Sequence, residues 1–378
     1  MTRAEVVKLL RERFGEVDKW LTAPDWWPSD LESAEALLRR LPQVKVREIG
    51  RSAGGRPILA AEWGEKEPLE TTANSLASAF AAAGTRPDPL NLFPPAFYGR
   101  QRRTRQVLVI QGALHGMEID GTVAALNLLH ILHTGTDLRG KPWDRLRAEA
   151  AKLRICVIPF LNADGRARSP FHHFVGASNE LCQFVHMGTW KDGRPIVYPD
   201  HKAIWPLPLA EVGFLGAYFN DRGVNLQYDS CVPHRQPETT AWMQYYLDER
   251  PDCVLICHSN AGSLMGNPDT FLPVPFQHQQ SRVAGLVRQY IFDHGQRAGR
   301  TTYAQLPDFG TPNFNQHCGV YHTCGALPLM CEFPCGLPGR PYTMDECLDI
   351  GLLVLEAICF FANRDGFRPL AVWDRRSV

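Results

Sequence analysis

The stretch VLVIQGALHGMEIDG, residues 107–121, decides the fold class of this 378-residue chain. Its first part, 107–114, is a nearly continuous apolar run, which is typical of a strand buried on both faces. Segment 121–133 follows at once and has the length and apolar content of a helix. A buried strand that leads directly into a helix indicates an α/β fold, because helices cover both faces of a parallel sheet.

The same alternation of strand and helix continues along the chain and predicts a doubly wound α/β sheet. Further buried strands are expected at 153–160, 253–258 and 326–333, and helices at 237–249, 283–299 and 346–363. Nearer the N-terminus we expect helices at 2–14 and 30–40, the second capped by Ser29 or Asp30, and strands at 44–50 and 57–63 around the turn SAGGR.

These segments predict an N-terminal helical segment, 1–43, followed by a single catalytic domain, 44–378. Large α/β folds reach this length as one domain. Two stretches without the strand and helix pattern, at about 65–105 and 170–215, are expected to be insertions in that domain. The second is rich in aromatic residues and histidines, so it is a candidate for a loop that shapes a substrate pocket.

The composition excludes several classes of protein and of partner. The chain is 44% hydrophobic and 21% charged, which is ordinary for a globular protein and excludes a wholly disordered one. Its 40 Lys and Arg balance 40 Asp and Glu, so nucleic acid or an anionic membrane is not expected as the main partner. No apolar run approaches the roughly 18 residues of a membrane-spanning helix.

The cysteines and the N-terminus predict a cytoplasmic protein. The first residues, MTRAEVVKLLRERF, form a charged amphipathic pattern without the apolar core of a secretion signal. Cysteine occurs 11 times, an odd number, and several copies lie in strand-like apolar runs where buried, reduced thiols are usual. These are Cys156, Cys253, Cys257 and Cys331.

Each of the four buried strands leads into polar residues of the kinds used in catalysis. Because ligands of open α/β sheets bind outside the carboxyl ends of the strands, these residues are expected to lie together. In chain order they are His115 and Glu118; Asn162, Asp164 and Arg166; His258; and Glu332.

Three of these residues predict a metal site. His115 and Glu118 form the pattern His-x-x-Glu in a strand-to-helix turn, where side chains three apart can converge on one point. His258 is the candidate for a remote third ligand. Two imidazoles and one carboxylate, with a fourth position left open, are typical of a catalytic zinc site. We therefore expect one Zn²⁺ ion.

Glu332 has two interpretations. At the end of an apolar strand an unpaired carboxylate would be costly, so the residue is either an ion-pair partner of an arginine or a functional group. The functional interpretation is a general base beside the metal, which takes a proton from a metal-activated water and passes it to the leaving amine.

At this point the sequence resembles a known family, the zinc carboxypeptidases of the carboxypeptidase A/B type. The resemblance rests on seven segments in the family's order and covers about residues 45–335. It implies a three-layer α/β/α sandwich with a central mixed, mostly parallel sheet of about eight strands. It also implies that His115, Glu118 and His258 bind zinc and that Glu332 is catalytic. The segments are GRSAGGRPI (50–58), His115 with Glu118, LNADG (161–165), RGVNLQYD (222–229), PETTA (237–241), LICHSN around His258 and LMCEFP around Glu332.

The segment RGVNLQYD departs from the family's Arg-Gly-Val-Asp-Leu-Asn-Arg-Asn. In the family, an Asn-Arg pair binds the terminal carboxylate of the substrate, and Gln227 and Tyr228 stand at those positions here. Tyrosine cannot replace the bidentate, charge-assisted bonds that arginine makes to a carboxylate. Either another arginine takes this role, with Arg166, Arg222 or Arg235 as candidates, or the substrate is an amide without a terminal carboxylate.

Two further roles stay open between several residues. The arginine that polarises the scissile carbonyl in the family has Arg166, Arg168 and Arg222 as candidates here, and Trp190-Lys191 resembles the family's Trp-Arg only weakly. The tyrosine that closes over the substrate has Tyr321 or Phe314 as its counterpart. The candidate substrate-binding residues are Asn162, Gln227, Tyr228 and Tyr321.

The sequence thus predicts a zinc-dependent hydrolase that cleaves a peptide or amide bond, a metallopeptidase of the carboxypeptidase type. One alternative is a zinc-dependent deacylase of N-acyl amino acids, because GALHGMEIDG also resembles the turn of succinylglutamate desuccinylase and aspartoacylase. The other is a non-catalytic binding domain on the same fold, which the altered carboxylate-binding segment favours. The sequence makes no prediction of the oligomeric state.

Overall fold

A computed structural model describes residues 3–68, 75, 104–197, 200–259, 265, 271–296, 315–339 and 341–369. Most of the insertion expected at 65–105 lies outside the described residues, as does Phe314. The insertion expected at 170–215 is described almost completely and forms short helices and a two-stranded ribbon.

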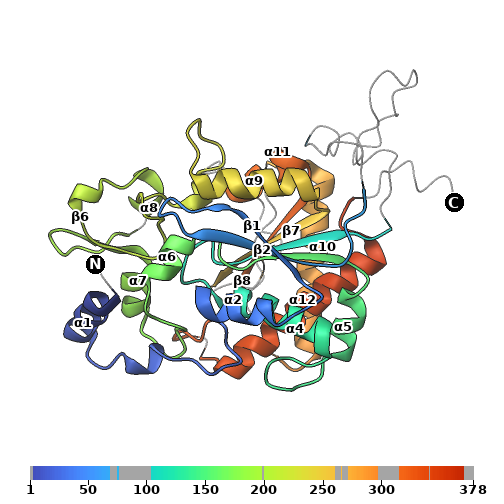
Figure 1. Cartoon of the computed structure of the whole chain (residues 1–378), viewed down its shortest axis with the longest axis horizontal. Helices are drawn as coiled ribbons and strands as arrows, with labels where there is room; N and C mark the ends of the chain where they lie inside the picture. Colours follow the sequence, from blue (N-terminus) through green and yellow to red (C-terminus); the bar gives the residue numbers. More distant parts are fainter. Residues whose placement is uncertain are drawn as a thin grey trace.

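The centre of the molecule is a six-stranded mixed sheet with the order β1-β2-β4-β3-β7-β8 (Figure 1). The four strands β4, β3, β7 and β8 are parallel, and the hairpin β1-β2 joins them antiparallel. The mostly parallel sheet is confirmed, but the expected number of about eight strands is too high for the described residues. Strands β5 (Gly188–Trp190) and β6 (Val212–Leu215) pair with each other in a separate ribbon. The central strands are β1 (Lys45–Arg51), β2 (Pro57–Trp63), β3 (Val107–Gln111), β4 (Arg154–Ile158), β7 (Cys253–Ser259) and β8 (Leu327–Phe333).

Helices cover both faces of this sheet because the strands are apolar on both sides. In β3, Leu108 and Ile110 belong to one buried cluster, whereas Val107 and Val109 belong to another. Helices α9 and α11 pack mainly on the second cluster and the remaining large helices on the first, which Figure 1 shows as helices above and below the sheet. The helices of these two layers are α2 (Leu31–Arg39), α4 (Asp120–Thr134), α5 (Asp144–Ala150), α9 (Pro237–Glu249), α10 (Val274–Asp293), α11 (Gln316–Cys324) and α12 (Met344–Asp365).

Local signals account for where several helices begin. Asp30 is the residue that caps α2, because its side chain accepts a hydrogen bond from the Ser33 N–H. Thr343 and Glu346 form a capping box at the start of α12. The helix predicted at 283–299 in fact begins nine residues earlier, directly after Pro273. Proline is well suited to that position since it has no N–H to leave unsatisfied.

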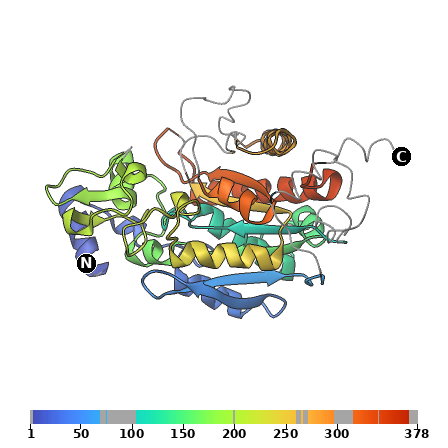
Figure 2. The same ribbon diagram turned by 90° about the horizontal axis from the view of Figure 1, so that it is seen from above.

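A smaller body lies beside one end of the sheet and contains α1 (Arg3–Phe14), α6 (Ala163–Arg168), α7 (Asn179–Met187), α8 (Asp200–Ala203) and the β5-β6 ribbon (Figures 1 and 2). Its own buried cluster joins Val6 and Leu10 of α1 to Phe171 and Met117. Because Met117 lies between His115 and Glu118, this body packs directly behind the predicted metal site.

All eleven cysteines lie in the described part of the chain, and none forms a disulfide there. Cys156, Cys253, Cys257 and Cys331 are buried free thiols, as expected. A cytoplasmic location itself stays a prediction. Across the described residues, every helix is too short or too polar to span a lipid bilayer.

Candidate metal centre

The three predicted metal ligands converge at the carboxyl ends of β3 and β7. Glu118 Oε2 lies 2.9 Å from His115 Nδ1 and 2.7 Å from His258 Nδ1. One ligand atom from each residue lies within 4.8 Å of the others, and all three residues are at most 3% exposed. The convergence expected of a His-x-x-Glu turn is confirmed: the Glu118 N–H donates to the His115 carbonyl and closes the turn.

The turn requires a residue without a side chain at position 116. A Cβ on Gly116 would lie 2.3 Å from the backbone of Gly165 and of Arg166, which is far inside van der Waals contact. The Gly116 N–H also donates to the carbonyl of Ala217 at 2.9 Å. The His-Gly-Met-Glu turn is therefore clamped between α6 and the segment that follows β6.

The donor set fits a zinc ion. Two neutral imidazoles and a carboxylate are common zinc ligands, and here both Nδ1 atoms face the same carboxylate oxygen. The other ring nitrogen of His258, Nε2, is buried and has no hydrogen-bond partner among the described residues. That of His115 lies 3.2 Å from Asn225 Oδ1. A ligating imidazole is usually held in this way by an acceptor behind it, so Asn225 fits the role of an outer partner of His115.

The three groups also perturb one another's charge. Burial opposes ionisation of Glu118, but the imidazoles of His115 and His258 hold the pKa of Glu118 well below its usual range. Burial lowers the pKa of His115. Although burial acts against it, the Glu118 carboxylate raises the pKa of His258. A divalent cation binds the anionic carboxylate and the neutral imidazoles. Glu118 is therefore already in its binding form, and His115 gives up its proton readily, whereas His258 must lose its proton when the ion binds.

Glu332 lies beside this group. Strands β7 and β8 are parallel, and Glu332 is the register partner of His258, so both side chains leave the sheet on the same face. No hydrogen bond or ion pair joins Glu332 to another side chain within the described ranges, which leaves the predicted ion pair with an arginine without support. Burial raises the pKa of Glu332 to about 7, and the negative charge of Glu118 acts in the same direction.

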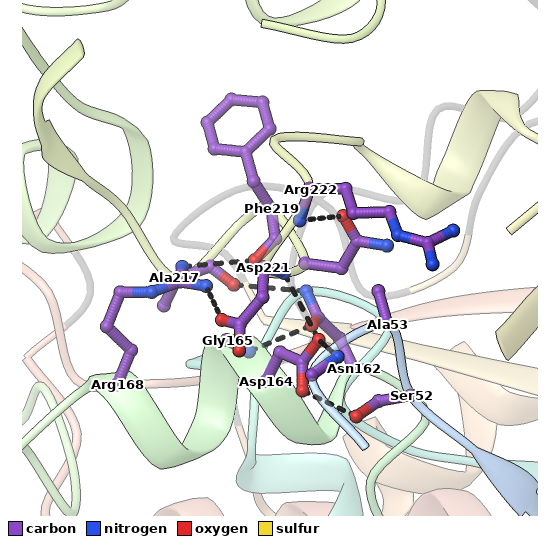
Figure 3. A network of polar contacts seen from close by, with 12 residues as sticks. Ser52, Ala53, Asn162, Asp164, Gly165, Arg168, Ala217, Phe219, Asp221 and Arg222 are labelled. Carbon is purple, nitrogen blue, oxygen red and sulfur yellow. Dashed lines mark hydrogen bonds and ion pairs between the residues drawn. The ribbon is translucent and has the colours of Figure 1, made fainter. Parts of the chain in front are cut away.

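The arginines named as oxyanion candidates are placed differently. The guanidinium of Arg166 is buried and donates to the carbonyls of Ser169 (2.9 Å) and Phe171 (2.6 Å). Arg168 donates to the carbonyls of Gly216 and Phe219 and pairs with Asp221. These placements favour structural roles for both. Arg222 is exposed on a turn, and in Figure 3 its guanidinium points away from the labelled residues.

The four candidate substrate-binding residues lie in different parts of the structure. Asn162 caps α6 by accepting from the Gly165 N–H and donates to the carbonyls of Ala217 and Tyr218, so its amide is fully used inside the protein. Tyr321 packs edge-to-face on Phe276 in the main core, and its hydroxyl donates to the Ser75 carbonyl.

Gln227 and Tyr228 lie nearer the metal ligands, in the turn that begins at Asn225. The hydroxyl of Tyr228 is buried without a partner in the described structure. The ammonium of Lys202, in α8, lies 5.5 Å from the centre of the Tyr228 ring. Of the four candidates, this pair lies next to Asn225, which contacts His115, whereas the amide of Asn162 is used to hold two backbone carbonyls.

The sequence interpretation missed Tyr218 and His186. The Tyr218 ring stacks on the His115 ring at 3.5 Å between centroids and 9° between planes. His186 Nδ1 lies 4.0 Å from Glu118 Oε1. Both residues come from the insertion at 170–215 or directly after it, where no periodic pattern indicates which side chains turn inward. For Asn225 the signal was present, because it lies inside the segment RGVNLQYD.

A polar network around Asp164 holds the surroundings of the site together (Figure 3). The buried carboxylate of Asp164 accepts from the Ser52 hydroxyl, the Gly54 N–H, the Asp221 N–H and the Arg56 guanidinium. The β1-β2 turn, the start of α6 and the loop before Asn225 thus meet at one side chain. The motifs SAGGR and LNADG therefore have a structural role here, because their residues bond to one another around Asp164.

Glu238, at the start of α9, should make stability depend on pH. It accepts from the Ala53 N–H and the Asn220 amide, and burial raises the pKa of Glu238 to about 7. The folded protein therefore binds this proton more tightly than the unfolded chain, whose Glu titrates near 4.5. Its contribution to the free energy of unfolding is present in acid and falls between pH 4.5 and about 7, by at most about 3 kcal/mol.

Denaturant unfolding of the wild type and of Glu238→Gln at several pH values between 4.5 and 8 tests this expectation. The variant lacks the titration, so its stability relative to the wild type should increase across the range. Replacement of the exposed Glu211 by Gln should leave the pH profile of the wild type unchanged. Parallel profiles for the wild type and Glu238→Gln would contradict the expectation.

Comparison with known proteins agrees with this geometry. The sequence profile of the zinc carboxypeptidase family matches residues 31–304. The chain belongs to this family. Zinc carboxypeptidases use a zinc ion, and the group His115, Glu118 and His258 fits one. Family and site together indicate metal-dependent hydrolysis of peptides. A search of curated protein sequences finds no match.

Solved structures of metallo-carboxypeptidases share the fold of this chain. A metallo-carboxypeptidase from Burkholderia cenocepacia is similar with a TM-score of 0.54 and 17% identity over 89% of this chain and 70% of that one. Carboxypeptidase A from Helicoverpa armigera has a TM-score of 0.52 and 14% identity, over 95% of this chain and 80% of that one. At such identities the similarity establishes the fold, and the chemistry must be argued from the site.

Proposed function

We propose that this protein is a zinc-dependent hydrolase of a peptide or amide bond. The observation that carries the proposal is the meeting of His115 Nδ1 and His258 Nδ1 at one oxygen of Glu118, with Glu332 on the neighbouring strand. His115, Glu118 and His258 would hold one zinc ion. When bound, zinc polarises the scissile carbonyl and lowers the pKa of a coordinated water.

Glu332 supplies the proton transfers. Its carboxylate accepts a proton from the attacking water and then gives that proton to the leaving nitrogen. Two features support this role: the side chain shares a face of the sheet with His258, and it is free of ion pairs with other described side chains. A general base must be able to both accept and release a proton, which a carboxylate locked in a salt bridge cannot do readily.

The substrate class depends on the residues at Gln227 and Tyr228. Neither carries a charge that would bind a terminal carboxylate in the manner of arginine. Of the three arginines named as substitutes, Arg166 and Arg235 donate to backbone carbonyls, and Arg222 is exposed on a turn. We propose that a free C-terminal carboxylate contributes less to substrate binding here than it would in a site where an arginine binds it. We also propose that substrates with an amide-blocked C-terminus are accepted.

Metal analysis with a substrate panel tests the proposal. We expect about one zinc per chain in the wild type, and less than a tenth of that in His115→Ala and in His258→Ala, because each variant removes one of three ligands. His294→Ala is the matched control, since the imidazole of His294 bonds to the Tyr290 carbonyl at the end of α10, and its loss should leave the zinc content unchanged. The panel contains one peptide with a free C-terminus, its amide and an N-acyl amino acid.

Each outcome of this panel has a defined meaning. Cleavage of both peptide forms by the wild type, lost in the two histidine variants, supports the proposal. Activity confined to the N-acyl amino acid would replace the peptidase with a deacylase. Zinc-free protein after reconstitution, with no hydrolysis, would leave a binding domain and overturn the proposal.

A further inference from the structure

The Tyr218 ring contacts one predicted metal ligand, and its hydroxyl lies near a second. The ring is nearly parallel to the His115 ring, with the centroids 3.5 Å apart. Burial, together with the nearby charges of Glu118 and Glu332, raises the pKa of the Tyr218 hydroxyl well above its usual value, so this hydroxyl lies close to both carboxylates. One side chain therefore covers His115 and faces Glu118.

Two further histidine rings enclose the same tyrosine. His186 and His201 lie 5.6 and 5.7 Å from the Tyr218 ring, centroid to centroid, and meet it at angles of 41° and 83°. Since the third neighbour is the stacked ring of His115, Tyr218 is held in one orientation by rings on several sides. This packing limits the movement of the ring and of the imidazole that it covers.

The backbone of Tyr218 is fixed as firmly as its ring. Its N–H donates to the His186 carbonyl at 2.8 Å, and its carbonyl accepts from the Asn162 amide at 3.2 Å. The preceding residue, Ala217, accepts from the Gly116 N–H in the His-Gly-Met-Glu turn. The backbone at 217–218 is thus tied to the turn that carries both His115 and Glu118.

A hydroxyl donor at this position has a specific consequence for Glu118. Oε2 is the oxygen that both Nδ1 atoms face, whereas Oε1 faces His186. A carboxylate with a single ligating oxygen needs another group to stop its rotation, and such outer partners determine the geometry and affinity of a metal site. The folded chain places the Tyr218 hydroxyl, which can donate a hydrogen bond, near this carboxylate.

We propose that Tyr218 is a positioning residue of the metal centre, whose ring fixes the plane of the His115 imidazole and whose hydroxyl fixes the Glu118 carboxylate. This inference rests on the proposed function, because it requires that these residues bind zinc. Asn162 then acts one step further out, by holding the backbone of Tyr218.

Zinc affinity measured by competition with a chelator tests the inference without any substrate. Tyr218→Phe keeps the stacked ring and removes the hydroxyl, and we expect about tenfold weaker zinc binding. Tyr218→Leu removes both contacts and should weaken binding by about 100-fold. The visible absorption spectrum of the cobalt-substituted protein should shift in both variants, since it reports ligand geometry. A purely structural role would lower stability without changing this spectrum.

Tyr246→Phe is the matched control, because it also removes a buried hydroxyl, one that donates to Gln111 in the core beneath α9. Its zinc affinity and cobalt spectrum should equal those of the wild type. Affinities within twofold of the wild type and unchanged spectra in both Tyr218 variants would overturn the inference while leaving the proposed function intact. A wild type that binds no zinc would overturn the proposed function and this inference together.

Discussion

Replacement of Glu332 by Gln should lower kcat about 1,000-fold and leave the zinc content unchanged. Glutamine keeps the shape of the side chain but cannot accept a proton from the attacking water. General acid–base catalysis typically contributes 10²- to 10⁴-fold to a rate, and Glu332 is proposed to perform two proton transfers. Since Glu332 is not one of the three converging ligands, the metal site should remain complete.

The measurement combines steady-state kinetics with metal analysis, on the best substrate of the panel described above. Glu356→Gln provides a control for loss of a buried glutamate, because Glu356 is bonded to the Tyr290 hydroxyl between α10 and α12. Its kcat should equal that of the wild type. If Glu332→Gln retained kcat within twofold, with full zinc content, another group would have to be the general base.

Replacement of Asp164 by Ala should reduce the free energy of unfolding by about 3–5 kcal/mol. The carboxylate is buried and accepts four hydrogen bonds, and one of its donors is the charged Arg56. Arg56 keeps its ion pair with Asp221, but the Ser52 hydroxyl and the N–H groups of Gly54 and Asp221 lose their acceptor. Each buried donor left without an acceptor costs about 1–3 kcal/mol. Asp164→Asn keeps the volume but turns an NH₂ group towards N–H donors, so it should recover only part of the loss.

Urea or guanidinium unfolding measures this effect as a shift of the midpoint at constant slope. The control is Asp192→Asn, which removes an exposed carboxylate that is paired with Arg194 and should leave the midpoint unchanged. Because Asp164 joins the β1-β2 turn to the loop that leads into Asn225, Asp164→Ala should also weaken zinc binding. A midpoint equal to that of the wild type would show that the network contributes little to stability.

The amino-acid sequence by itself indicated most elements of the fold and the three side chains that converge as candidate metal ligands. The near-continuous apolar runs of β3, β4, β7 and β8 are typical of strands covered on both faces, and the described structure has them as parallel neighbours. His115 and Glu118 are three residues apart in one turn, so their convergence is a local property. His258 and Glu332 come together because parallel strands end at the same edge of a sheet.

The tertiary structure alone decided which polar side chains are free for chemistry. Arg166, Arg168 and Asn162 have the residue types of a substrate-binding site, but the fold commits their donors to backbone carbonyls. The position of Tyr218 on His115 depends on a segment about 100 residues further along the chain, in an insertion without periodicity. Such contacts are set by packing between distant segments, which a sequence pattern of period 2 or 3.6 does not encode.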